Sequence, residues 1–224
     1  MYLIGINNAI DAGVCLMKDG VLVEAINEER LNRKKNYQGL PQQCLDYLLN
    51  KQKLKVNDIG YFIYSWCGKQ NNYSEYINKL TKRIIKALTN NPNCSKIIKA
   101  RMQVELFRDE KLRFEFEQWM FELGVSKNKI VYLDHHKSHA WAAFAPSPFD
   151  EAFIFTFDAR GDLKSCSASY ADKNGIEELD YHLTFDSIGF LYGQITNYLG
   201  FTHNKHEGKV VGLAALGNPE KTLP

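Results

Sequence analysis

One succession of predicted elements occurs twice in this chain of 224 residues, and it constrains the fold more than any other feature of the sequence. Each copy has three apolar segments typical of strands and then a segment typical of a helix. The segments are 2–6, 12–17, 21–26 and 41–49 in the first copy, and 152–157, 165–170, 176–183 and 187–199 in the second. Asp19-Gly20 is a strong hairpin signal, because type I′ turns need positive φ. The repeat predicts an α/β protein in two similar parts.

The segment between the two copies predicts further strands and helices. Strands are expected at 59–64 and 130–133, a helix at 134–144, and two long helices within 73–122. The two long helices have no counterpart in the second copy. We therefore expect about 70–125 to be a helical insertion in the first part of the chain.

Pro146-Ser147-Pro148 is the best candidate for a linker. It divides the chain into a first part, 1–149, and a second part, 150–224. No element closes the second part, so we expect it to be incomplete within these residues. Its uncovered surface favours self-association, and a homodimer is expected.

The composition excludes several classes of protein. Apolar residues make up 45% of the chain, which is ample for a core. The formal net charge of +2 argues against a protein that coats nucleic acid, so no nucleic-acid partner is expected. The sequence has no run of about 18 uncharged apolar residues, so no membrane span is expected. The five cysteines are odd in number and form no CxxC pair, which is typical of a reducing cytoplasm.

The segment Asp134-His135-His136-Lys137-Ser138-His139-Ala140 is the strongest chemical motif. It follows a predicted strand and opens a predicted helix, where ligands favour binding in α/β proteins. His135 and His139 are four residues apart, so their imidazoles lie on one helical face and suit one divalent metal ion. The alternative is a surface or capping cluster. His136 points elsewhere, which favours packing or a contact with substrate.

Two imidazoles need a third ligand, and a carboxylate is the natural choice. Asp158 is the nearest candidate, and a ligand beyond residue 224 is the alternative. Asp158 also begins Asp158-Ala159-Arg160-Gly161-Asp162, which we expect to be a turn between two strands. Such a turn can present backbone amides to phosphate and hold hydrated Mg²⁺ through Asp158 and Asp162. A polar hairpin without a ligand is the alternative.

The segment 207–217, Glu-Gly-Lys-Val-Val-Gly-Leu-Ala-Ala-Leu-Gly, is rich in small residues. Gly208 and Gly212 allow a ligand to approach the backbone closely, and Lys209 could contact a phosphate. The alternative is a glycine-rich helix that packs on a sheet.

Two charged segments complete the set of motifs. Residues 28–35, Glu-Glu-Arg-Leu-Asn-Arg-Lys-Lys, could clamp an anionic substrate or form a solvated loop. A run of lysine and arginine within 79–101 could contact RNA, but it lacks the interleaved aromatic residues of single-strand binders. A solvated helix face is therefore the favoured interpretation of that run.

Taken together and in this order, these motifs resemble the N-terminal part of the family that contains the nodulation carbamoyltransferase and antibiotic O-carbamoyltransferases. The resemblance extends over nearly all of the chain and is weakest over 68–125. It implies an actin-like, ribonuclease-H-like fold with two lobes, mixed sheets and flanking helices, similar to the tRNA threonylcarbamoyl-transfer proteins. The second lobe would be truncated in this chain.

The resemblance also implies a reaction and its cofactors. In the family, a separate C-terminal domain makes carbamoyl-adenylate from carbamoyl phosphate and ATP, and the present domain transfers the carbamoyl group to an acceptor hydroxyl. The family's histidines hold an iron-like metal, which corresponds here to His135 and His139. A third family ligand, an aspartate, would lie beyond residue 224. Fe²⁺ is thus expected at the histidines and Mg²⁺ with the nucleotide.

Residues of this chain match the family's motifs one by one. The basic clamp corresponds to Lys35, and the phosphate hairpin to Asp158, Gly161 and Asp162. Asp11 matches the aspartate of the family's first hairpin, but Ile10 stands where a histidine usually precedes it. His136 is our candidate for the base that takes the proton of the acceptor.

We therefore predict the N-terminal part of an ATP-dependent carbamoyltransferase, inactive without its C-terminal domain. Two alternatives remain. One is an enzyme like the tRNA threonylcarbamoyl transferases, which would use the same metal site. The other is a nucleotide-binding module without catalysis, which the loss of histidine at Ile10 favours.

Overall fold

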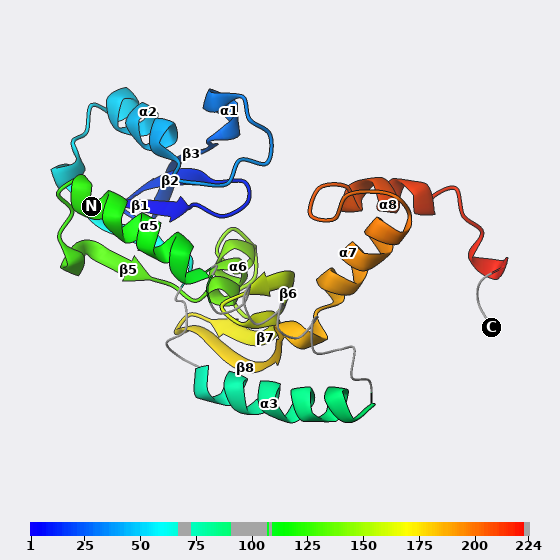
Figure 1. Cartoon of the computed structure of the whole chain (residues 1–224). Coiled ribbons are helices and arrows are strands. Elements are labelled where there is room, and N and C mark those ends of the chain that lie inside the picture. The colour runs from blue at the N-terminus through cyan, green and yellow to red at the C-terminus, as the bar shows by residue number, and fades with distance from the viewer. Residues whose placement is uncertain (67–72, 91–106, 108, 222–224) are drawn as a thin grey trace.

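The computed structural model describes residues 1–66, 73–90, 107 and 109–221, and the structural statements below concern these residues. They form two β-sheets with helices packed on them (Figure 1). The predicted fold class, α/β with flanking helices, is confirmed, although only the first of the two sheets is mixed and the second is antiparallel.

The first sheet contains five strands. Their order in space is β3 (Val21–Asn27), β2 (Gly13–Lys18), β1 (Tyr2–Asn7), β4 (Ile59–Tyr64) and β5 (Ile130–Tyr132). β1, β2 and β3 run antiparallel, whereas β1, β4 and β5 run parallel. Asp19 and Gly20 both have positive φ and join β2 to β3, as the sequence predicts. The carboxyl ends of the three parallel strands therefore lie at one edge of this sheet.

Helices α2 (Gln42–Gln52) and α5 (Asp109–Glu122) complete the apolar core of the first sheet. Alternate residues of the strands, such as Ile4 and Leu16, are fully buried. The rings of Tyr64 on β4 and Phe116 on α5 stack with their centroids 4.3 Å apart. The core thus joins strands and helices that are far apart in the sequence.

The side chain of Glu28 caps the start of α2 and is not available to bind a ligand. It precedes α1 (Glu29–Asn32), is only 3% exposed, and its carboxylate accepts hydrogen bonds from the backbone amides of Gln43 and Cys44. A carboxylate at this position accepts hydrogen bonds from amides of the first turn that have no partner within the helix. Its negative charge also interacts favourably with the positive end of the helix dipole. The sequence left open whether segment 28–35 is an anion clamp or a solvated loop, and the buried Glu28 fits neither alternative.

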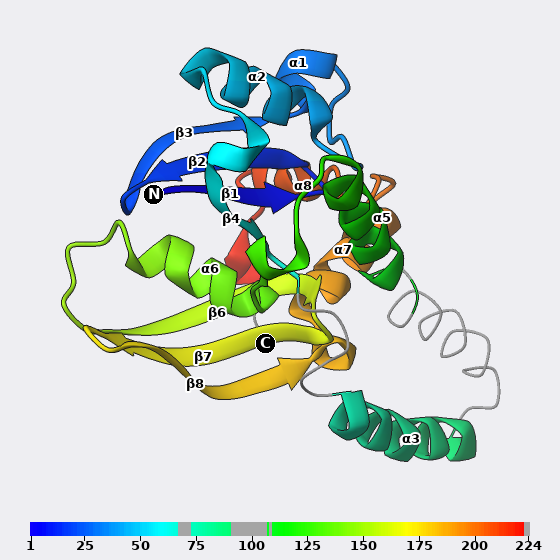
Figure 2. The same cartoon turned by 90° about the vertical axis from the view of Figure 1, so that its left-hand side faces the viewer.

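The second sheet is antiparallel, with the order β6 (Ala152–Gly161), β7 (Lys164–Asp172) and β8 (Gly175–Leu183). Helix α6 (His135–Phe144) lies along one face of it (Figure 2). Ala140 of α6 packs there with Ile154 and Ala171. The helix that carries the histidine motif thus precedes the linker in sequence but packs on the sheet that follows the linker.

The opposite face of the second sheet is open. Phe153, Phe155 and Phe157 alternate along β6 and are 66–70% exposed. β6 is also an edge strand, paired with β7 on one side. The described residues therefore cover only one face of this sheet.

β6 is longer than the sequence predicts. It continues through Gly161, which pairs with Lys164, so the turn contains only Asp162 and Leu163. Both have positive φ, 48° and 71°, as a two-residue type I′ turn requires. The prediction that the whole segment 158–162 is a turn is wrong, because 158–161 continue β6 and the turn begins only at Asp162.

Three further helices are α3 (Tyr73–Asn90), α7 (Ile188–Tyr198) and α8 (Glu207–Ala214). α7 contacts β6, and α8 packs on α7 away from the sheets (Figure 1). Tyr76 of α3 is buried against Leu163 and Leu183 at the end of the second sheet. Of the long helix expected from about 95 to 122, the structure describes α5, and the positions 95–106 lie outside the described residues. Within the described part of the chain, no helix is long and apolar enough to cross a membrane.

Candidate metal centre

Asp134 anchors the first turn of α6. Its Oδ1 accepts a hydrogen bond of 2.9 Å from the Lys137 backbone amide, which caps the helix. Its Oδ2 forms an ion pair of 3.1 Å with Lys164 of β7, and Lys164 also pairs with Glu178 of β8 at 2.7 Å. Burial alone would lower the pKa of Lys164, but Glu178 and Asp134 outweigh it and raise that pKa. Three charged side chains therefore tie the start of α6 to the second sheet.

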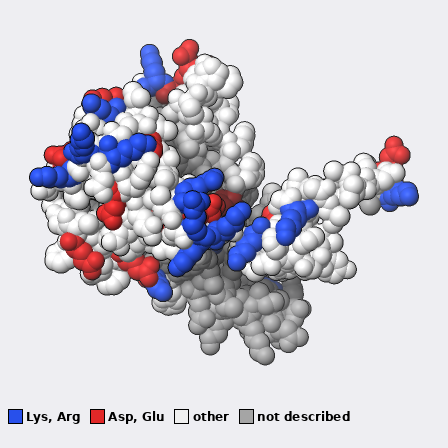
Figure 3. Space-filling model, turned by 90° about the horizontal axis from the view of Figure 1, so that it is seen from above, with Lys and Arg blue, Asp and Glu red and all other residues white. Residues whose placement is uncertain are grey.

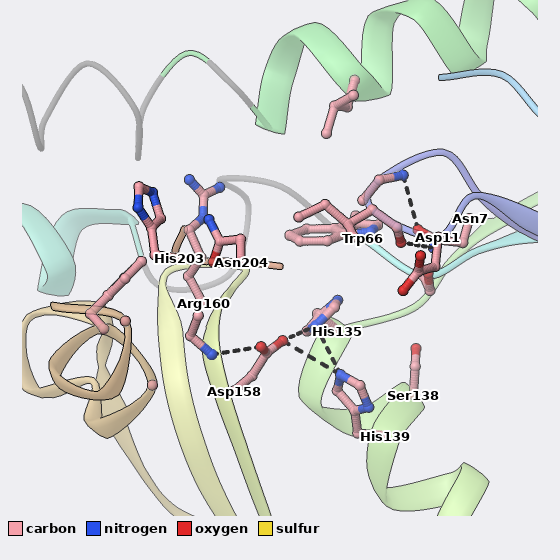
Figure 4. Close-up of a pocket in the computed structure, with 18 of the residues that line it drawn as sticks. Asn7, Asp11, Trp66, His135, Ser138, His139, Asp158, Arg160, His203 and Asn204 are labelled. Carbon is pink, nitrogen blue, oxygen red and sulfur yellow. Dashed lines mark hydrogen bonds and ion pairs between the residues drawn. The ribbon is translucent and has the colours of Figure 1, made fainter. Parts of the chain in front are cut away.

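Three side chains converge at the start of α6. His135 Nε2 lies 2.8 Å from Asp158 Oδ2 and 3.0 Å from His139 Nε2 (Figure 4). His139 Nε2 lies 3.6 Å from the same carboxylate oxygen. The two histidines are one helical turn apart on α6, and Asp158 reaches them from β6. The spacing of four residues thus produces the expected pair, and the second sheet supplies a carboxylate.

The three donor atoms lie within about 0.2 Å of the separations that a single divalent cation requires. Ligand atoms about 2.0–2.2 Å from one ion lie roughly 2.9–3.4 Å from one another, and the three separations here are 2.8, 3.0 and 3.6 Å. Two imidazoles and one carboxylate are a common donor set for divalent transition metals. His135, His139 and Asp158 could therefore hold a metal ion.

Asp158 brings a negative charge to this cluster. Burial alone would raise the pKa of Asp158, but contacts with His135 and His139 outweigh burial and lower it strongly. The side chain of His139 is 52% exposed, whereas that of His135 is 13% exposed. The cluster therefore presents an ionised carboxylate and is open to solvent on the His139 side.

A cavity of about 760 Å³ lies next to the cluster. Three of its lining residues come from the carboxyl ends of the parallel strands. Asn7 is the last residue of β1, Trp66 lies two residues after β4, and His135 lies three residues after β5. Gly189 and Gln194 of α7 contribute to another wall. Its volume lies within the range of about 300–1,000 Å³ that small-molecule sites occupy.

Four of the predicted site residues line this cavity: Asp11, His135, His139 and Asp158. Gly161 and Asp162 do not line it but touch His135. The backbone amide of His135 donates a 2.8 Å hydrogen bond to Asp162 Oδ2. Gly161 lies against the imidazole of His135.

The other predicted site residues lie outside the cavity lining: His136, Lys35, Gly208, Lys209 and Gly212. His136 is fully buried, and its Nδ1 is 2.7 Å from Thr156 Oγ1. Burial lowers the pKa of His136 to about 4, and the nearby His135 adds to the effect. The structure therefore places His136 in the packing of α6 on β6 and away from the space that a substrate could enter.

Several cavity residues were not expected from the sequence. Trp66, Arg160, His203 and Asn204 all line it (Figure 4). Trp66 lies two residues beyond β4, so the tendency of ligands to bind at strand carboxyl ends could have indicated it. His203 and Asn204 precede α8, and only the tertiary structure brings them to the cavity.

Charged side chains of both signs are spread over the surface. Seen from above, Lys and Arg form one group near the middle of the molecule, with Asp or Glu among them (Figure 3). The described atoms on this face show no continuous basic stripe of the kind that tracks a nucleic-acid backbone.

The chain matches one described protein family over almost its whole length. Residues 2–223 match the family model described as "Carbamoyltransferase N-terminus". The chain is 30% identical over 209 residues to the nodulation protein NolNO of Sinorhizobium fredii, in an alignment that covers 93% of this chain and 28% of that protein. It is 31% identical over 215 residues to the uncharacterized protein sll1178 of Synechocystis sp., covering 94% and 34% of the two.

The chain spans about a third of the length of these relatives. Among solved structures, it is similar to YeaZ from Pseudomonas aeruginosa with a TM-score of 0.41 and 9% sequence identity. That superposition covers 81% of this chain and 66% of the YeaZ chain.

Proposed function

The chain belongs to the carbamoyltransferase family as its N-terminal part, and from this premise we propose that it transfers a carbamoyl group to an acceptor hydroxyl. The proposed donor is carbamoyl-adenylate, which the remainder of a longer protein makes from carbamoyl phosphate and ATP. The observation that carries the proposal is the cluster of His135, His139 and Asp158 beside a cavity large enough for a nucleotide.

The proposed transfer is a simple exchange at the carbamoyl carbon. The acceptor oxygen forms a bond to this carbon, and the bond from the carbon to the phosphate oxygen of the adenylate breaks. The acceptor hydroxyl releases its proton to solvent, and AMP leaves with the electron pair of the broken bond. The cavity walls must therefore hold a nucleotide and leave one side open to the acceptor.

His135, His139 and Asp158 would hold a divalent cation, which we propose to be Fe²⁺, while Mg²⁺ accompanies ATP. When bound, a cation of this kind polarises a phosphate or carbonyl oxygen as a Lewis acid. The exposed His139 side of the cluster is where a ligand can approach, because His135 is largely covered.

Other residues of the chain would bind and orient the nucleotide. Asp11 lines the cavity near the end of β1, where it could accept hydrogen bonds from a ribose or hold hydrated Mg²⁺. Arg160 lines the same cavity from β6, and a guanidinium suits phosphate oxygens. His136 has a structural part in this proposal, since it joins α6 to β6 through Thr156.

The remaining candidates lie farther from the cluster. A Cβ atom at Gly208 or Gly212 would meet nothing within 4 Å, so the backbone of α8 is accessible there. We propose that Lys209 on α8 and the exposed Lys35 contact phosphate groups that extend beyond the cavity. The C-terminal part of the longer protein is the proposed partner of this surface.

Elemental analysis and titration of the purified chain test the metal site. Wild-type protein is expected to bind one divalent cation per chain, and His135→Ala and His139→Ala are each expected to abolish retention of the metal. His182→Ala removes an exposed histidine outside the cavity lining and is the matched control. Equal metal content in all four proteins would contradict the proposed site.

Transfer is tested with radiolabelled carbamoyl phosphate, ATP and a panel of small hydroxyl acceptors. We expect the chain alone to bind nucleotide weakly and to transfer no label, because the step that forms the adenylate lies in the remainder of the longer protein. Joined to that remainder, it is expected to transfer label, and His139→Ala is expected to remove this activity. Efficient transfer by residues 1–224 alone would contradict the proposed division of the reaction.

A further inference from the structure

The imidazole of His135 is held in a narrow slot between the two sheets. On one side lies Trp66, which follows β4 of the first sheet, with its ring centroid 4.2 Å from that of His135. On another side lies Gly161 of β6, in the second sheet. A Cβ atom at Gly161 would lie 1.9 Å from His135 Cδ2 and 2.4 Å from Cγ.

Van der Waals packing, more than hydrogen bonding, sets the position of the His135 imidazole. His135 Nδ1 is buried and has no hydrogen-bond partner among the residues that the structure describes. The hydrogen bonds on the opposite side, at Nε2, go to Asp158 and His139, which are themselves the other donors of the cluster. A metal-bound histidine is usually oriented by a hydrogen bond from its other ring nitrogen. In this chain, packing against Trp66 and Gly161 takes that place.

We propose that Gly161 is a positioning residue for His135, and that its missing side chain allows Nε2 to face Asp158 and His139. The proposal rests on the proposed metal site. The φ angle of Gly161 lies outside the left-handed region, so the position needs glycine for space and not for backbone freedom. The next residue supports the same histidine, because Asp162 accepts a hydrogen bond from its backbone amide.

A methyl group at residue 161 would have to displace the imidazole. No protein atoms approach within 2 Å without bonding, and Trp66 restricts movement of the ring on its own side. A shift of the ring away from residue 161 would change the position of Nε2 relative to Asp158 Oδ2, now 2.8 Å away. The effect on metal binding should therefore exceed the effect of a methyl group elsewhere near the cavity.

Co²⁺ titration followed by visible absorption tests the effect on metal binding. Gly161→Ala is expected to weaken Co²⁺ binding at least tenfold and to change the absorption band of the bound ion. Gly217→Ala is the matched control, because this glycine is exposed and a Cβ there would meet only the carbonyl oxygen of Ala214, at 3.2 Å. Its Co²⁺ affinity should stay within twofold of wild type. Wild-type affinity and spectrum in Gly161→Ala would overturn the proposal.

A double-mutant cycle on the metal-free protein tests the contact itself. Gly161→Ala is expected to lower the urea midpoint of the wild-type chain but not that of His135→Ala, because the second protein has no imidazole to displace. If Gly161→Ala fails to fold, Gly161→Ala/His135→Ala should fold again. Equal losses in both backgrounds, or no folding of the double variant, would overturn the proposal.

The two experiments separate this proposal from the proposed function. If wild-type protein binds no Co²⁺, the proposed metal site fails, and with it the role of Gly161 in metal binding. The cycle still reports whether Gly161 makes room for His135. A coupled cycle together with unchanged Co²⁺ binding would overturn the positioning role and leave the metal site in place.

Discussion

Each sheet contains three consecutive strands that pair antiparallel in sequence order, β1-β2-β3 and β6-β7-β8. The interactions that stabilise the two sheets differ. The first has an apolar core in which Ile4, Leu16 and Phe62 are completely buried. The second buries polar residues under α6, including Thr156 and Ser167, and leaves the phenylalanines of its other face exposed.

This difference shows what each half contributes to the site. Burial of apolar area stabilises the first sheet without regard to direction. Hydrogen bonds and ion pairs are directional, and those between α6 and the second sheet fix where the histidines lie. The cluster therefore depends most on the half of the molecule with less apolar burial.

Removal of the same aromatic side chain from each region gives the largest expected contrast. Phe116→Ala deletes a fully buried ring stacked on Tyr64 and should lower the free energy of unfolding by about 3–5 kcal/mol. Phe155→Ala deletes a ring that is 66% exposed on β6 and should change it by less than about 0.5 kcal/mol. Urea denaturation of both variants measures the two values. Similar losses would show that the open face is covered in solution.

Removal of one lysine from each region gives the next largest contrast. Lys164→Met leaves Asp134 and Glu178 without their buried cation and should cost about 3 kcal/mol. Lys51→Met breaks an exposed pair with Glu24 and should change the stability far less, because solvent screens such a pair. The same denaturation experiment compares them. An equal cost for both would contradict the role of Lys164 in holding α6.

The buried polar contact between α6 and β6 should have a smaller effect. Thr156→Val keeps the shape of the side chain but removes the partner of His136 Nδ1, which should cost about 1–2 kcal/mol. Thr81→Val on α3 removes an exposed hydroxyl that bonds within its own helix, and it serves as the control. Thermal unfolding of the two variants is the measurement. A variant at residue 156 as stable as wild type would mean that the contact contributes nothing.

The smallest expected effect is the contribution of Glu117, in the first region, to the loss of stability at low pH. Burial would raise the pKa of Glu117, but hydrogen bonds from Tyr132 and Arg113 outweigh it and lower the pKa below its ordinary value of 4.5. A lowered pKa in the folded state stabilises the protein above pH 4.5, and this contribution is lost as the pH falls below that value. Wild-type stability should therefore fall more steeply below pH 4.5 than that of Glu117→Gln.

Unfolding midpoints between pH 3 and 7 measure this slope. Glu115→Gln is the control, because its carboxylate makes one exposed pair with Lys111 at 3.7 Å. Its pH dependence should follow that of wild type. If the unfolding midpoints of all three proteins depend on pH in the same way, Glu117 does not contribute to the loss of stability in acid.

Local signals in the sequence predicted the elements well, and distant contacts explain where they failed. Alternating apolar residues marked the strands, and the spacing of His135 and His139 predicted their shared face. The cap of α2 comes from Glu28, fourteen residues before the helix, so no local pattern could show it. The sequence also could not show why residue 161 is a glycine, because the space beside it is filled by the imidazole of His135, which lies on another element.

The order of the chain also sets the order in which the cluster can assemble. A ribosome makes His135 and His139 before any strand of the second sheet. Until β6 and β7 have been made, α6 has neither Asp158 nor the partners of its buried face. A nascent chain that ends at the linker therefore carries the two histidines without the cluster. If the proposed site holds a metal ion, the ion can bind there only after the hairpin of β6 and β7 has left the ribosome.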